Sequence, residues 1–155
     1  MSTTHEPRLD LVHHIGGTYA AMARVEERID LEPRLRHLVK LRAAQMNGCA
    51  YCIDMHRMEA LKDGDTDLRL AQLPAWRESP AFDARERAAL WLTESVTLIS
   101  ETHVPDDVWD EAARHFPAQE LANLLAAIAA INFWTRLQVS VRAIPASYAQ
   151  EAAAA

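Results

Sequence analysis

The sequence is poor in glycine, aromatic residues and cysteine, and each scarcity excludes a class of protein. Only four glycines and 6% aromatic residues occur in 155 residues, and no segment alternates polar and apolar residues as a β-strand does. Two cysteines are too few for the framework of a small disulfide-rich domain. Lys and Arg form no cluster and the net charge is −6, which argues against a nucleic-acid-binding surface. We therefore expect an all-α protein that binds no nucleic acid.

The sequence also predicts neither a secretory signal nor a membrane-spanning segment. The N-terminal residues have neither the basic nor the apolar stretch of a secretory signal. The most apolar segment, Leu121–Thr135, is short for a membrane span and is interrupted by Asn123 and Asn132. We expect a cytoplasmic protein with no membrane association, in which a cysteine pair more often serves catalysis or metal binding than structure.

Helix-forming residues are what the sequence has in abundance: Ala, Leu, Glu and Arg. Start and stop signals predict a bundle of about six to seven helices in a single domain, residues 1–155, with residues 1–7 and 146–155 loose. The expected helices cover 9–29 (interrupted at Gly16-Gly17), 30–46, 49–63, 65–73, 83–101, 105–115 and 119–143.

Two of these helices need partners elsewhere in the fold. The last helix is apolar on nearly every side, so other helices or a second subunit must cover it. Arg42 lies on the apolar stripe of the helix 30–46, and a buried guanidinium group needs an acidic partner that the sequence does not identify.

The segment Gln45–His56 holds both cysteines, three residues apart, and a histidine four residues after the second. On a helical wheel Cys49, Cys52 and His56 fall within about 60° of one another, so we expect them to face one small space. Cys49 lies in the first turn, where free backbone N–H groups favour a thiolate.

A thiolate beside a second thiol and a proton carrier is sufficient for reversible redox chemistry. One thiolate attacks the O–O bond of a hydroperoxide and becomes a sulfenic acid, and the second thiol condenses with it to a disulfide. An external reductant then restores both thiols, while His56 transfers the protons. Two other interpretations remain open: two inert buried cysteines, or a zinc site in which His37 or another histidine of the chain adds a fourth ligand to Cys49, Cys52 and His56.

The pattern Asn47-Gly48-Cys49-x-x-Cys52-x-x-x-His56, on the second of two consecutive helices, resembles the alkyl hydroperoxidase D (AhpD) core of the carboxymuconolactone decarboxylase family. The stretches Leu38–Gln45 and Ala129–Arg136 resemble it too, and the resemblance covers roughly residues 15–145.

The resemblance implies an AhpD-like helical bundle with peroxidase activity and no cofactor. It makes Cys52 the nucleophile, Cys49 the resolving thiol and His56 part of the proton relay. It also implies a lipoyl-bearing or thioredoxin-like reductant protein and a homo-oligomer, either a trimer or a hexamer.

The sequence departs from AhpD at two positions. The relay glutamate twelve residues before the first cysteine is replaced by His37, which can shuttle protons but cannot supply a carboxylate that orients His56. Tyr51 stands where AhpD has a histidine. Two further hypotheses therefore accompany the peroxidase: a redox-sensing or disulfide-exchange protein without efficient peroxide turnover, and a non-redox protein that binds a small acid or a metal.

Overall fold

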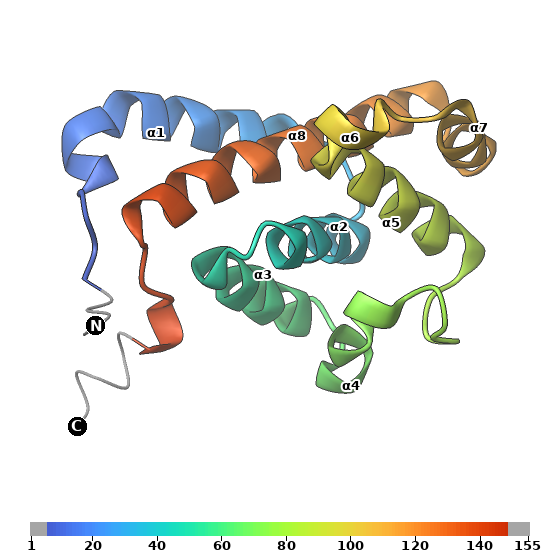
Figure 1. Ribbon diagram of the computed structural model, residues 1–155, viewed down its shortest axis with the longest axis horizontal. Helices are drawn as coiled ribbons and strands as arrows, with labels where there is room; N and C mark the ends of the chain where they lie inside the picture. Colours follow the sequence, from blue (N-terminus) through green and yellow to red (C-terminus); the bar gives the residue numbers. More distant parts are fainter. Residues whose placement is uncertain (1–5, 149–155) are drawn as a thin grey trace.

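The computed structural model describes residues 6–148, and all the regular elements of this part are helices (Figure 1). Six of them have seven or more residues, which confirms the expected all-α bundle. The helices are α1 (Leu11–Arg28), α2 (Pro33–Met46), α3 (Ala50–Lys62), α4 (Asp67–Ala71), the 3-10 helix η1 (Leu73–Ala75), α5 (Ala84–Thr97), α6 (Ile99–Thr102), α7 (Asp106–His115) and α8 (Ala118–Val141).

Helix α2 lies at the centre of the bundle and packs against α3, α5 and α8. Its start is encoded locally, because Pro33 needs no amide partner and the Glu32 carboxylate accepts hydrogen bonds from the N–H groups of Arg34 and Leu35. Leu38 and Val39 are completely buried. The buried apolar residues form three clusters, and α2 contributes residues to each of them. Helix α2 therefore connects α3 to the other helices that pack around it.

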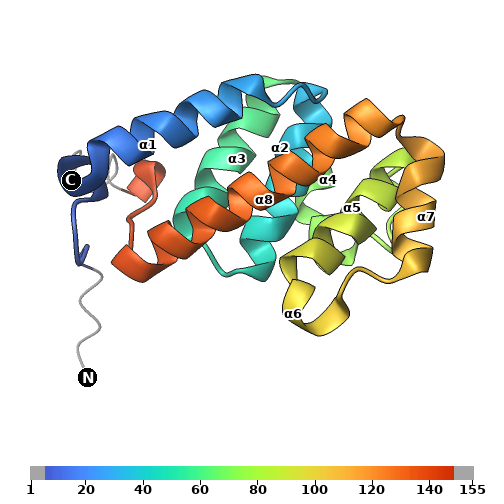
Figure 2. The ribbon, with the colours of Figure 1, turned by 90° about the horizontal axis from the view of Figure 1, so that it is seen from above.

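Helix α8 is covered by other helices, as its apolar composition requires. It packs against α1, α2, α3, α5 and α7, and Figure 2 shows it crossing the bundle diagonally beside α1. By length and composition alone α8 could cross a membrane, but half of its most apolar window is buried inside the protein, as in the core helix of a globular domain. Val139, near its end, stays 45% exposed.

The helix boundaries differ from expectation at three places. Helix α1 continues through Gly16-Gly17, and its kink lies one residue earlier, at Ile15, whose backbone is non-helical. The expected helix 83–101 is broken at Leu98 into α5 and α6. Pro74 lies inside η1 rather than ending a helix at Leu73, because a 3-10 turn tolerates proline in its first positions.

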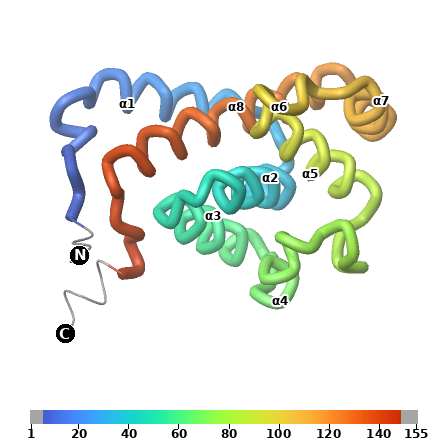
Figure 3. Tube along the Cα trace, in the orientation of Figure 1, coloured from blue at the N-terminus to red at the C-terminus, as the bar shows by residue number. Residues whose placement is uncertain are grey.

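The last described residues fold back onto α3 instead of being loose. Residues 146–148 form a helical turn, in which the Ser147 hydroxyl and N–H donate to the two carboxylate oxygens of Asp54 at 2.6 and 3.1 Å. At the same end of the molecule, the Arg8 N–H donates to the Val141 carbonyl (Figure 3). The C-terminal segment is thereby fixed beside the start of α3.

Candidate active site

The turn between α2 and α3 is held in place by α8. Gly48 adopts a φ of 66°, a left-handed conformation that favours glycine. The Asn47 side-chain amide donates to Asn132 Oδ1 at 2.9 Å and Thr135 Oγ1 at 3.0 Å. The motif that carries the cysteines and the stretch 129–136 therefore meet directly.

Cys49 and Cys52 form a disulfide at the start of α3. Cys49 is the N-cap of the helix, and its sulfur accepts a hydrogen bond from the N–H of Cys52 at 3.2 Å. Both residues are only 1% exposed and pack against Ala43, Ala44 and Ile131. The disulfide is thus shielded from bulk solvent.

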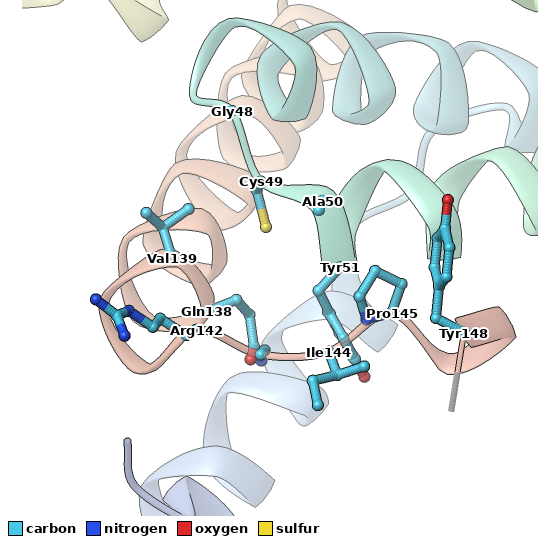
Figure 4. A pocket seen from close by; sticks show the side chains of 11 residues that line it. Gly48, Cys49, Ala50, Tyr51, Gln138, Val139, Arg142, Ile144, Pro145 and Tyr148 are labelled. Atoms are coloured by element: carbon cyan, nitrogen blue, oxygen red, sulfur yellow. The ribbon is translucent and has the colours of Figure 1, made fainter. Parts of the chain in front are cut away.

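The two cysteines line different cavities, although the wheel placed them in one space. Cys49 lines a cavity of about 520 Å³, which we call the Cys49 cavity, and Figure 4 shows its sulfur pointing inward. Cys52 lines a second cavity of about 390 Å³, which we call the histidine cavity. Tyr51 and Gln138 line both and form the wall between them. The side chains that line the histidine cavity include His37, Lys40, Cys52, His56, Glu59 and Trp134.

His56 is oriented by a carboxylate on its own helix. Its Nδ1 lies 2.9 Å from Glu59 Oε2, and the ring is 4% exposed. Burial lowers the pKa of His56 below its ordinary value, although the hydrogen bond to Glu59 opposes this. Contacts with His37 and His56 hold the pKa of Glu59 well below its usual range. Near neutral pH, a neutral His56 donates Nδ1–H to the Glu59 carboxylate and keeps the lone pair of Nε2 free as a base.

His37, on α2, lies beside Glu59 and His56. Its Nε2 lies 2.9 Å from Asp63 Oδ2, and its Nδ1 lies 3.2 Å from Glu59 Oε2 without making a well-aligned hydrogen bond. As the sequence indicates, His37 supplies no carboxylate to His56, but Glu59 on α3 supplies one, and this residue was missed from the sequence. The i, i+3 spacing of His56 and Glu59 on one helix was the signal that could have revealed this residue.

An ion pair closes the far wall of the histidine cavity. The Lys40 ammonium group, on a side chain that is 6% exposed, binds the Glu26 carboxylate. Trp134 Nε1 donates to the other oxygen of Glu26 at 3.1 Å. The charge of Lys40 is thus held near Cys52 and His56 by partners from α1 and α8, and it contributes to lowering the pKa of His56.

One set of residues could hold a metal ion. A ligand atom from each of His37, His56 and Glu59 lies within 4.8 Å of the others, and two imidazoles with a carboxylate suit Zn²⁺ or Fe²⁺. The Asp63 carboxylate, which contacts His37 Nε2, would orient the His37 ring in such a metal site. The sequence analysis left open a different zinc site, one that uses both cysteines. In the disulfide form Cys49 and Cys52 are joined and offer no thiolate to a metal ion.

Comparison with known proteins gives a consistent family assignment. The family model of the carboxymuconolactone decarboxylase family matches residues 16–95, just over half of the chain. The chain is 41% identical to the uncharacterised protein YdfG of Bacillus subtilis, over 68% of this chain and 72% of that one. It is 36% identical to the uncharacterised protein YnjA of Escherichia coli, over 77% of this chain and 65% of that one.

Solved structures share the fold. A protein of unknown function from Agrobacterium tumefaciens, ATU0492, provisionally assigned to the antioxidant defence protein AhpD, superposes with a TM-score of 0.88 at 36% identity. The match covers 90% of this chain and 98% of that one. An uncharacterised peroxidase-related protein from Silicibacter sp. TM1040 gives a TM-score of 0.78 over 96% of both chains, and at 15% identity it is similar in fold alone.

Proposed function

Because the chain belongs to the carboxymuconolactone decarboxylase family, we propose that it is a thiol-dependent peroxidase that reduces hydroperoxides through a Cys49–Cys52 disulfide cycle. The observation that carries the proposal is the histidine cavity, where the redox-active Cys52 shares a buried space with His56, whose ring is oriented by Glu59. A thiol that must be deprotonated and an imidazole that can accept its proton thereby meet in one place.

In the proposed oxidation, the Cys52 thiolate attacks one peroxide oxygen and breaks the O–O bond. Cys52 becomes a sulfenic acid, and the leaving alkoxide takes up a proton, which returns through His56. The Cys49 thiolate then attacks the sulfenic sulfur, which forms the disulfide and expels hydroxide, and the hydroxide takes up the proton lost by the Cys49 thiol to give water. The N–H of Cys52 that caps the Cys49 sulfur would stabilise the attacking thiolate.

The position of Cys49 at the N-cap favours its thiolate, yet Cys52 is the better candidate for the nucleophile. Cys52 lines the cavity that also contains His56 and Lys40, whereas Cys49 lines the other one. Peroxide reduction needs a proton donor for the leaving oxygen, and a low thiol pKa does not supply it.

The reductant and assembly that accompany this proposal follow from the family resemblance, and the location follows from the sequence features described above. We expect a lipoyl-bearing or thioredoxin-like protein to reduce the disulfide. We also propose a cytoplasmic homo-oligomer, either a trimer or a hexamer.

The test is mass spectrometry of the reduced protein with thiol alkylation, before and after one equivalent of an organic hydroperoxide. Loss of two alkylatable thiols and of two hydrogens would establish the disulfide cycle. Cys52→Ser should abolish turnover, whereas Cys49→Ser should allow one oxidation and then stall. Thiols that stay unchanged in the presence of peroxide, or full turnover by Cys52→Ser, would contradict the proposal.

The alternative is a redox-sensing or disulfide-exchange protein without efficient peroxide turnover. Its support in the sequence was the missing carboxylate at position 37, and Glu59 now occupies that role in the geometry. Steady-state hydroperoxide consumption with excess dithiol separates the two, because a protein without efficient peroxide turnover would raise consumption little above the background reaction of the dithiol itself.

A further inference from the structure

The Cys49–Cys52 bond lies between two cavities, and the second of them has no role in the oxidation proposed above. Cys49 lines the larger cavity, of about 520 Å³, while His56, Glu59 and Lys40 all line the other. Figure 4 shows the Cys49 sulfur directed into this space, between α8 and the C-terminal segment. A sulfur that is 1% exposed and still faces a cavity is reachable by a small group alone.

We propose that the Cys49 cavity is the binding site for the reductant, and that the two halves of the catalytic cycle use opposite faces of the disulfide. Hydroperoxide reacts at Cys52 from the histidine cavity, and a dithiol carried on a slender apolar arm reacts at Cys49 from the Cys49 cavity. This inference rests on the proposed function for its oxidative half, and the reductive half can be measured separately.

The direction of thiol–disulfide exchange supports the assignment. An attacking thiolate approaches along the S–S axis from behind the sulfur that it attacks, so access from the Cys49 cavity selects Cys49. The first step joins the reductant sulfur to Cys49 and releases Cys52 as a thiolate into the cavity that the Lys40 ammonium group lines.

The second step completes the transfer of two electrons. The remaining thiolate of the reductant attacks its own sulfur in the mixed disulfide, closes an intramolecular disulfide and releases Cys49 as a thiolate. That thiolate is again stabilised, because the N–H of Cys52 points at the Cys49 sulfur from 3.2 Å. The dithiol is oxidised, the protein disulfide is reduced, and the two thiolates take up protons from solvent.

The rim of the cavity indicates the chemistry of the arm. Three large apolar side chains line the cavity and are nevertheless exposed: Val139 by 45%, Ile144 by 40% and Tyr148 by 65%. Arg142 also lines the cavity and no acidic residue does, which disfavours a positively charged arm. A thiol fixed on a flat protein surface cannot reach a sulfur at such a depth, whereas a thiol at the end of a flexible chain can.

A matched pair of obstructing substitutions tests the separation. Val139→Trp narrows the Cys49 cavity, and Ala23→Trp, at an exposed position on α1, narrows the histidine cavity. Stopped-flow fluorescence measures two rates in each variant: oxidation of the reduced protein by cumene hydroperoxide, and reduction of the disulfide by dihydrolipoamide.

We expect Val139→Trp to slow reduction by about tenfold and leave oxidation unchanged, and Ala23→Trp to do the reverse. Size-exclusion chromatography checks that both variants keep the assembly of the wild type. Equal effects on both rates, or no effect of Val139→Trp on reduction, would overturn the inference. If hydroperoxide oxidises neither the wild type nor the variants, the proposed peroxidase function is contradicted. The rate of disulfide reduction can still be measured in that case, and it tests the inference separately.

A second measurement identifies the sulfur that is attacked. The oxidised protein is mixed with a monothiol, 2-mercaptoethanol, quenched with acid within milliseconds and digested. A mixed disulfide on Cys49 is the expected product, and one on Cys52 would contradict the inference. Asp54→Ala, which removes both hydrogen bonds to Ser147, should change the reduction rate alone because it releases the segment that shapes the Cys49 cavity.

Discussion

Two partly buried polar clusters flank α2, and the difference between them separates a structural ion pair from a reactive site. In the first, which we call the Glu94 cluster, the Glu94 carboxylate accepts hydrogen bonds from Arg42 Nε at 2.8 Å and Trp76 Nε1 at 2.7 Å, and pairs with Arg77 at 2.6 Å. In the second, the histidine cluster, Glu59 lies between His37 and His56. Both have a carboxylate at the centre and partners from several helices.

The clusters differ in whether any hydrogen-bonding group is left without a partner. Burial would raise the pKa of Glu94, but the hydrogen bonds from Trp76, Arg77 and Arg42 outweigh it and lower that pKa, and both oxygens are occupied. In the histidine cluster, His37 Nδ1 has no well-aligned partner, and the cluster lines a cavity beside Cys52. A buried polar cluster with all its groups satisfied stabilises a fold, whereas one with spare proton capacity that faces a cavity can do chemistry.

The largest expected effect comes from removing the base of the histidine cluster. His56→Ala should slow oxidation by hydroperoxide about 100-fold, because the proton for the leaving oxygen must then come from water. The second-order rate constant of the reduced protein, measured at several pH values, is the readout, with Arg57→Ala on the same helix as the control. A rate that stays within a factor of two of the wild type would remove His56 from the proposed mechanism.

The Glu94 cluster should give the opposite result. Glu94→Ala leaves Arg42, whose side chain is 16% exposed, without its anion, which should lower the free energy of unfolding by about 3 kcal/mol. The rate of oxidation per folded molecule should not change. Chemical denaturation measures the stability, and Glu94→Gln, which still accepts from Trp76, should lose less. A large loss of specific activity in folded Glu94→Ala would contradict the distinction between the two clusters.

How far the sequence predicted these clusters depends on whether partners are near in the chain. The helical class and the Cys49, Cys52 and His56 motif follow from periodicity and local spacing, and the structure joins the cysteines as predicted. The partner of Arg42 was out of reach, because Glu94 lies 52 positions away and helical packing alone brings them together.

The division into two cavities was also hidden from the sequence. A helical wheel assumes that each residue is inside the helix, but Cys49 is the N-cap and has extended backbone angles. The wheel therefore brought the two sulfurs together, in agreement with the disulfide, but it did not show that Cys49 lines a different cavity from Cys52 and His56.

A smaller effect tests how the carboxylate of the histidine cluster acts. In Glu59→Gln, His56 loses a charge that raises its pKa, so the pKa of His56, already lowered by burial, falls further. Because the neutral ring is the active form, the acid limb of the pH–rate profile should move to lower pH, while the maximal rate falls by about tenfold as the ring loses its orienting anion. A shift to higher pH would show that Glu59 has a different role.

The smallest expected effect is at position 37, where the chain departs from the AhpD pattern. If the missing glutamate limited the rate, His37→Glu would increase peroxidase activity. The structure argues otherwise, because Glu59 already orients His56, and a new carboxylate would lie near both Glu59 and Asp63. Three carboxylates in one cluster repel one another when ionised, so we expect a change in kcat/KM of no more than about threefold. Steady-state kinetics would decide between these expectations, and a gain of tenfold or more would mean that Glu59 does not replace the relay glutamate. His37→Gln, which adds no charge, separates loss of the imidazole from repulsion between carboxylates.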